Sequence, residues 1–127
     1  MGQPSDGISA GPWSILIVED EFFIALDLKA TLTEAGFQVL GPTSTVHTAL
    51  EAINEQLPHA AVLDVNLGRE RVTPVAMLLK ELHVPFVLTT ASAAHELALD
   101  PALAGAENLG KPTNLVKLVK ALRELLA

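Results

Sequence analysis

The chain has 127 residues, a formal net charge of -7 and no cysteine, and half of its residues are hydrophobic. This length is typical of one domain that buries its own core. The absence of cysteine excludes disulfides and thiolate metal ligands, and the acidic balance argues against a nucleic-acid partner. Without a membrane-spanning apolar run or a signal-peptide pattern, the protein is expected to be cytoplasmic and not bound to membranes.

Residues 1–13 are rich in Gly, Pro and Ser and are predicted to form a flexible tail before one domain over residues 14–127. Beyond the tail, short aliphatic runs alternate with amphipathic segments, which is typical of an α/β fold with a parallel sheet. The predicted strands cover residues 15–18, 37–40, 60–63, 86–89 and 106–109. The predicted helices cover residues 21–35, 46–57, 73–82, 92–99 and 114–126.

Several helix ends carry recognisable stop and start residues. Gly36 is predicted to end the first helix, because glycine readily adopts the left-handed conformation of a C-terminal cap. Thr73 is expected to cap the third helix, with Pro74 in its first turn. The last helix is predicted to bury one apolar stripe, consisting of Leu115, Leu118, Val119, Leu122, Leu125 and Leu126.

Acidic side chains follow two of the predicted strands. Glu19 and Asp20 come directly after the first strand, and Asp64 comes directly after the third. Because ligands of parallel sheets bind at the carboxyl ends of the strands, these carboxylates are expected to converge if the two strands are neighbours. Carboxylates about 4 Å apart repel one another. Mg²⁺, which prefers oxygen ligands, would relieve that repulsion.

Two further residues at strand ends suit phosphoryl chemistry. A metal at the acidic cluster would attract a phosphoryl donor, and Asp64 would be the nucleophile that forms an acyl phosphate. Lys111 would pair with the phosphoryl oxygens, and Thr90 would donate a hydroxyl hydrogen bond to them.

The segments ILIVEDE, AVLDVNL, FVLTTA and LGKP occur in this order. Together they resemble the response regulator receiver domain, the CheY-like family of two-component signalling, and the resemblance covers residues 14–127. It implies an α/β fold with a doubly wound, five-stranded parallel sheet of order 2-1-3-4-5 flanked by five helices.

The resemblance also assigns roles. Glu19 and Asp20 would bind Mg²⁺ with Asp64, and Asn66 would add its backbone carbonyl. Asp64 would accept a phosphoryl group from a sensor histidine kinase or a histidine phosphotransfer protein. Thr90 would be the switch hydroxyl and Lys111 the phosphate-sensing lysine, with a Lys-Pro bond that is often cis in the family.

The chain departs from the family pattern in three places. Asn108 stands where receivers usually carry an aromatic residue whose rotamer follows the threonine. The interval between Asp64 and Thr90 is short, which predicts a trimmed connection near residues 67–73. The Ala-rich segment 91–105, with its early Pro101, predicts a short fourth helix.

Two surfaces are predicted to bind partners. Phe23, Leu26 and Ala30 project from the first helix opposite its core face, which suggests docking of a partner helix from the phosphodonor. The last helix carries Lys117, Lys120 and Arg123 on its solvent side, and with Asn108 these residues are candidates for an output or homodimer surface; a solvated helix face explains the basic stripe equally well.

The function predicted from the sequence is a stand-alone receiver, because the chain ends with the last helix. It would be a phosphoacceptor and not an enzyme, and it would signal by binding an unidentified downstream protein or act as a phosphate sink. One alternative is a receiver-like binding module that takes no phosphate. Another is a small Mg²⁺ phosphohydrolase, although Asn66 stands where such hydrolases carry a second Asp.

Overall fold

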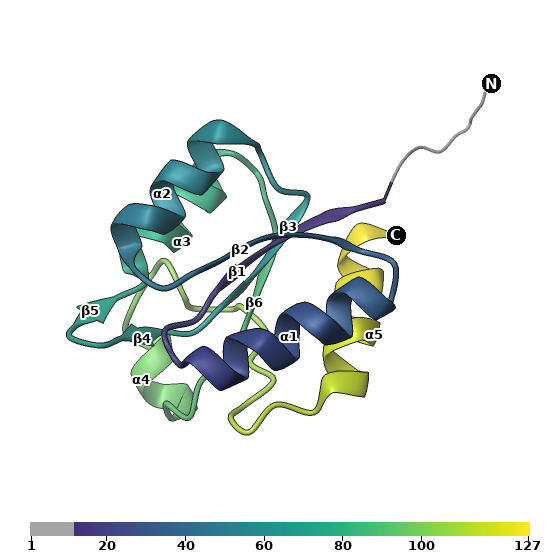
Figure 1. The fold of residues 1–127 in the computed structure, drawn as a ribbon. Helices are drawn as coiled ribbons and strands as arrows, with labels where there is room; N and C mark the ends of the chain where they lie inside the picture. Colours follow the sequence, from purple (N-terminus) through teal and green to yellow (C-terminus); the bar gives the residue numbers. More distant parts are fainter. Residues whose placement is uncertain (1–11) are drawn as a thin grey trace.

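The computed structural model describes residues 12–127. A parallel sheet has the order β2-β1-β3-β6, formed by β1 (Ser14–Val18), β2 (Gln38–Thr43), β3 (Ala60–Leu63) and β6 (Phe86–Leu88) (Figure 1). A small hairpin of β4 (Asn66–Leu67) and β5 (Glu70–Arg71) follows β3. The helices are α1 (Phe22–Glu34), α2 (Val46–Glu55), α3 (Thr73–Glu81), α4 (Ala94–Ala98) and α5 (Leu115–Leu126).

Helices cover both faces of the sheet (Figure 1). On one face of the sheet, α1 and α5 pack against the side chains of alternate strand residues, including Ile15 and Ile17 of β1. On the other face α2 and α3 pack on Leu16 and Val18. Because β1 is buried on both faces, apolar residues are favoured on both of its sides, and Ile15 to Val18 are all aliphatic after the buried Ser14.

The first helix follows the sequence prediction closely. Its buried residues are Ala25, Leu28 and Leu32, which recur at helical spacing. Gly36 follows the helix with a φ of 95°, so the predicted glycine stop is confirmed. Within residues 12–127, neither this helix nor any other is long and apolar enough to cross a membrane.

The fifth predicted strand is reduced to a single bridge. Leu88 pairs in parallel with Asn108, supported by hydrogen bonds from the N–H of Leu88 to the C=O of Glu107 and from the N–H of Leu109 to the C=O of Leu88. Gly105 and Gly110 flank this segment with φ values of 85° and 81°. These left-handed residues turn the chain at both ends, so only one residue stays in register with β6.

The trimmed connection after β3 is a hairpin. Gly68, with a φ of 62°, forms its turn. Thr73 does not cap α3 as predicted: Val72 is the N-cap and Thr73 is the first helical residue. The Thr73 hydroxyl instead donates a 2.6 Å hydrogen bond to Asp100 Oδ2, because Asp100 is a stronger acceptor within reach.

Other helix boundaries differ by a few residues. The predicted helix 92–99 shrinks to α4, and α2 ends at Glu55, two residues earlier than expected. In α5, Ala121 is buried and Leu125 is exposed, so Leu125 lies outside the buried stripe. It sits near the C-terminal end of the helix.

Most of the predicted tail, residues 1–11, lies outside the described residues. Trp13 belongs to the described part: its carbonyl accepts a hydrogen bond from the N–H of Gln38, and its ring packs edge-on against His59 with centroids 4.9 Å apart. Trp13 therefore continues the pairing of β1 with β2 at the amino end of the sheet.

Replacing a leucine beneath α1 is expected to cost far more than replacing an exposed one. Leu28→Ala removes a side chain that is 1% exposed, and should lower the free energy of unfolding by about 2–5 kcal/mol. Leu99→Ala removes one that is 82% exposed, and should change it by no more than about 0.5 kcal/mol. Urea denaturation of both variants measures the difference; equal losses would contradict the assignment of the core.

Candidate functional site

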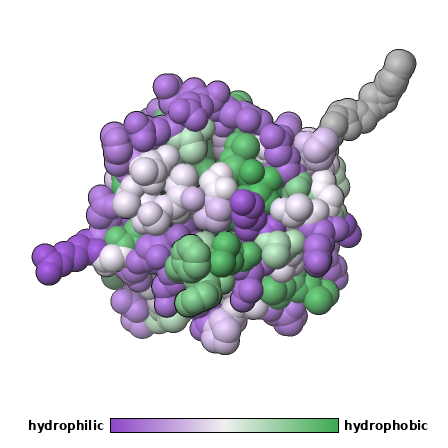
Figure 2. Space-filling view, in the orientation of Figure 1, coloured by the Kyte–Doolittle hydropathy of each residue, from purple (hydrophilic) through white to green (hydrophobic). Residues whose placement is uncertain are grey.

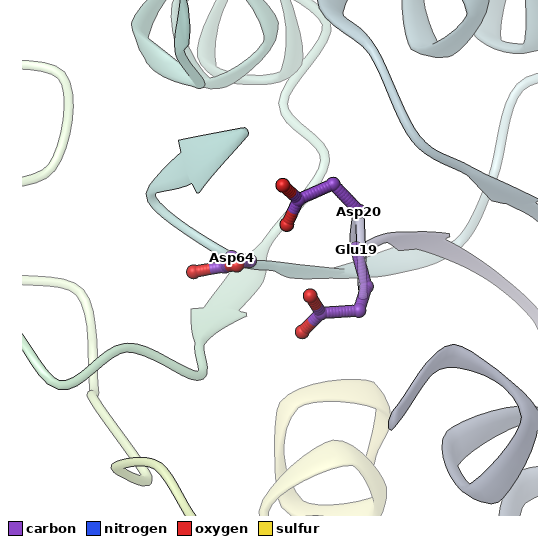
Figure 3. A group of neighbouring side chains, drawn as sticks. All are labelled: Glu19, Asp20 and Asp64. Carbon is purple, nitrogen blue, oxygen red and sulfur yellow. The ribbon is translucent and has the colours of Figure 1, made fainter. Parts of the chain in front are cut away.

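Three carboxylates meet at the carboxyl ends of β1 and β3. Val18 pairs with Leu63 at the end of the two strands, and the N–H of Asp64 donates to the C=O of Val18 at 2.9 Å. The residues that follow each strand are therefore neighbours. One oxygen each from Glu19, Asp20 and Asp64 lies within 4.8 Å of the others, and Figure 3 shows the three groups directed toward the same space.

Glu19 is buried together with Asp64, whereas Asp20 is exposed. Burial raises the pKa of Glu19 from 4.5 to about 7, and the charge of Asp64 adds to the effect. The N–H of Glu21 and the ammonium of Lys111 oppose it by stabilising the charged form.

Lys111 is surrounded by carboxylates. Its Nζ lies 3.0 Å from Asp64 Oδ2, 2.6 Å from Glu21 Oε2 and 3.2 Å from each oxygen of Glu19. Burial alone would lower the pKa of Lys111, but the hydrogen bonds to Glu21 and Asp64 and the nearby negative charges raise it well above its usual value. Lys111 is therefore a permanent cation beside Asp64.

Glu21 is a site residue that the sequence reasoning missed. It is the N-cap residue of α1, it lines the same cavity as Asp64, and it makes the shortest of the Lys111 contacts. The available signal was its position directly after Glu19 and Asp20. The sequence prediction assigns this position only to the beginning of the helix over residues 21–35. The peptide bond between Lys111 and Pro112 is cis, as the family resemblance implied.

Asp20 and Asn66 lie at the hairpin side of the cavity. Asp20 is exposed, and its Oδ2 accepts a 2.8 Å hydrogen bond from the N–H of Gly68 in the hairpin turn. Asn66 opens β4, and its side chain donates to Ser92 Oγ at 3.4 Å. The role of its backbone carbonyl as a metal ligand stays a prediction.

Thr90 lies on the opposite side of the same cavity. The residue is buried, and its Oγ1 donates to Ser92 Oγ and accepts from the N–H of Ser92, each at 3.1 Å. Its backbone N–H and C=O are both bound by the side chain of Asn108. The cavity has a volume of about 580 Å³ and is lined by Asp20, Glu21, Asp64, Asn66, Gly68, Thr90, Ala91, Ser92 and Lys111.

The donor set fits a divalent cation that prefers oxygen. Glu19, Asp20, Glu21 and Asp64 bring four carboxylates to the edge of the sheet, and within residues 12–127 Lys111 is the cation that contacts Glu19, Glu21 and Asp64. Among residues 12–127, no group donates a hydrogen bond of good geometry to the buried Oε1 of Glu19, which has only the ion-pair contact with Lys111 at 3.2 Å and so keeps lone pairs for a cation. Mg²⁺ is bound in proteins by such carboxylate oxygens.

The predicted docking residues are exposed on α1. Phe23 is 78% exposed, and Leu26 and Ala30 are also exposed. Figure 2 shows apolar surface over this helix. Phe22, which the sequence reasoning did not single out, is exposed as well and packs edge-on against Phe23.

The basic stripe of α5 is exposed as predicted, with one qualification. Lys117 and Lys120 point to solvent, whereas Arg123 Nη2 donates a 3.0 Å hydrogen bond to the C=O of Ala35. Arg123 therefore also fastens α5 to the end of α1.

Comparison with known proteins gives consistent results. The family model of the response regulator receiver domain matches residues 15–123. The sequence is 28% identical to the transcriptional regulatory protein PdtaR of Mycobacterium tuberculosis over 95% of this chain, and the match spans 60% of PdtaR. It is 24% identical to the chemotaxis protein CheY of Thermotoga maritima, over 87% of this chain and 95% of that protein.

Solved structures agree with the fold. A response regulator receiver protein from Sinorhizobium medicae superposes with a TM-score of 0.80 at 28% identity, covering 91% of this chain and 94% of its own. A CheY-like receiver domain protein from Methanospirillum hungatei gives a TM-score of 0.81 at 25% identity, with the same coverage.

The buried Glu19 is expected to make stability depend on pH. The unfolded chain releases this proton near pH 4.5 and the folded chain near pH 7, so the folded state binds the extra proton between them. In that window the contribution of Glu19 to the free energy of unfolding should fall with rising pH, by at most about 1.4 kcal/mol per pH unit. Urea denaturation of wild type and Glu19→Gln in EDTA measures it as the difference between the two proteins. A pH-independent difference would show that burial does not retain the proton.

Proposed function

Because the chain belongs to the response regulator receiver family, we propose that it accepts a phosphoryl group on Asp64 in a Mg²⁺-dependent reaction. One observation carries the proposal: Asp64 lies 3.0 Å from the ammonium of Lys111 and belongs to one cluster of carboxylate oxygens with Glu19 and Asp20. The phosphoacceptor and the groups that would handle its charge therefore share one cavity at the end of the sheet.

In the proposed reaction a carboxylate oxygen of Asp64 attacks the phosphorus of a phosphohistidine. A phosphorus–oxygen bond forms, giving an acyl phosphate, while the phosphorus–nitrogen bond breaks. Its electron pair goes to the imidazole, which takes up a proton from solvent and leaves as a neutral ring. The chain itself supplies positioning and charge, which are the main requirements of phosphoryl transfer.

Each of the site residues predicted from the sequence has a distinct part in this proposal. Glu19, Asp20 and Asp64, with the backbone carbonyl of Asn66, hold Mg²⁺, which when bound neutralises negative charge on the transferring group. Lys111 exchanges its contact with Asp64 for one with a phosphoryl oxygen. Thr90 turns its hydroxyl from Ser92 toward the same group.

The donor is proposed to be a sensor histidine kinase or a histidine phosphotransfer protein that docks on α1. Phe23, Leu26 and Ala30 form an exposed apolar surface, and α1 begins directly after the acidic residues of the cavity. A partner helix resting on this surface would bring its phosphohistidine to Asp64.

Output is proposed to run through contact with a downstream protein, through a homodimer, or by withdrawal of phosphate from another regulator. The candidate surface comprises Asn108, Lys117 and Lys120, with the exposed part of Arg123. A phosphorylated population would shift an equilibrium between two arrangements of this region. A phosphohydrolase is less consistent with the site, because Asn66, two residues after Asp64, offers no carboxylate for acid–base work.

Phosphorylation itself can be tested without knowing the donor. Incubation with phosphoramidate and Mg²⁺, followed by intact-mass analysis, should add one phosphoryl group to the wild type and none to Asp64→Asn. EDTA should abolish the addition, because the carboxylates then lack the cation that lets the donor approach. Failure of the wild type to take up phosphate would reject the proposal in favour of a binding module.

Docking on α1 is tested by comparing two kinds of donor. Phe23→Ala should slow transfer from a phosphorylated partner protein by about tenfold, since buried aromatic anchors dominate such interfaces, and should leave the phosphoramidate reaction unchanged. Met77→Ala is the matched control, because Met77 is also exposed but lies on α3, across the sheet. Equal slowing by both variants, or no slowing by Phe23→Ala, would remove α1 as the docking surface.

A further inference from the structure

The structure assigns a task to Asn108 that the family pattern does not supply: we propose that it is a positioning residue that holds Thr90 and Lys111, the two groups expected to contact the phosphoryl group, in a fixed relation to each other. This inference rests on the proposed function of Asp64. Its physical basis is one side chain that binds two separate segments of the cavity wall.

The first of these segments is the end of β6. Backbone pairing with residues 107–109 stops at Leu88, whose N–H and C=O are bound by Glu107 and Leu109. At Thr90 the side chain of Asn108 takes over: Oδ1 accepts from the N–H of Thr90 and Nδ2 donates to its C=O, both at 3.1 Å. The side-chain amide of Asn108 thus extends the hydrogen bonding between the two parallel segments as far as Thr90.

The second segment leads to Lys111. The same Oδ1 of Asn108 accepts a 3.0 Å hydrogen bond from the N–H of Gly110, the residue directly before Lys111. The C=O of Gly110 in turn accepts from the Thr113 hydroxyl at 2.7 Å, which closes the turn around Lys111. Only one orientation of the amide satisfies all three of its contacts, since Nδ2 cannot accept from an N–H.

The contacts of Asn108 fix the backbone of Thr90 and do not involve its hydroxyl group. Oγ1 of Thr90 bonds only with Ser92 among the described hydrogen bonds, so it can rotate about the Cα–Cβ bond without breaking the contacts of Asn108. An aromatic residue at position 108 could not make these bonds, because its ring has no amide to pair with the backbone. In this chain, threonine and lysine are therefore coupled through hydrogen bonds instead of through an aromatic rotamer.

The first test measures the contact directly in the unphosphorylated protein. Asn108→Ala should speed hydrogen exchange of the Thr90 amide by about tenfold, the scale of one modest hydrogen bond. Asn108→Asp keeps the acceptor oxygen but replaces the Nδ2 donor with an oxygen that faces the C=O of Thr90, so its exchange rate should fall between those of the wild type and Asn108→Ala. Asn114→Ala is the matched control: Asn114 caps α5 by accepting from the N–H of Lys117, so its loss lowers stability without touching Thr90. Unchanged exchange in Asn108→Ala would overturn the inference.

The second test measures positioning by phosphorylation with phosphoramidate and Mg²⁺. Asn108→Ala should react about tenfold more slowly than the wild type and Asn114→Ala at the wild-type rate. In a Thr90→Ala background the effect of Asn108→Ala should shrink, because there is no hydroxyl left to position. Fully additive losses, or equal losses in the Asn108 and Asn114 variants, would reduce Asn108 to a structural residue.

The two tests fail in distinguishable ways. If the wild type takes no phosphate, the proposed function of Asp64 fails, and the exchange measurement alone then decides whether Asn108 holds the Thr90 segment. If the wild type is phosphorylated and Asn108→Ala reacts at the same rate, the proposed function stands and the positioning role is rejected.

Discussion

Repulsion among carboxylates at the carboxyl ends of β1 and β3 is the constraint on which the site depends. Glu19 and Asp64 are buried side by side, and the charge of Asp64 is one reason why the pKa of Glu19 is raised. In the folded chain Lys111 reduces this repulsion, because its ammonium contacts Glu19, Glu21 and Asp64 together. In the proposed function, a divalent cation and a phosphoryl group would change this balance of charge, and the carboxylates and Lys111 would exchange contacts.

The elements around the cavity connect this charge balance to the rest of the molecule. The hairpin turn binds Asp20 through the N–H of Gly68, and its far end contacts Asp100 through Arg71, at 3.7 Å. On the other side Asn108 binds the backbone of Thr90. These contacts join the cavity to the end of α4 on one side and to residues 108–113, which lead to α5, on the other.

Burial made most of the fold predictable. The apolar runs of β1 and β3 and the periodic faces of α1 and α5 correctly placed these elements, because a doubly covered sheet requires those patterns. The wrong predictions concern segments whose structure depends on tertiary contacts and not on the local sequence pattern. Residues 106–109 pair with β6 at one residue because glycines turn the chain on both sides, and Thr73 bonds to Asp100, far along the sequence, instead of capping its own helix.

The sequence by itself determined the fold class, the family and the acidic residues at the strand ends, because each depends on residue type and order along the chain. The tertiary structure alone decided how those residues are partnered. It revealed Glu21 as a third carboxylate on Lys111, and it replaced the expected role of position 108 with hydrogen bonds to Thr90 and Gly110. Hydrogen bonds and ion pairs depend on distances of about 3 Å between residues far apart in the chain, which no local pattern specifies.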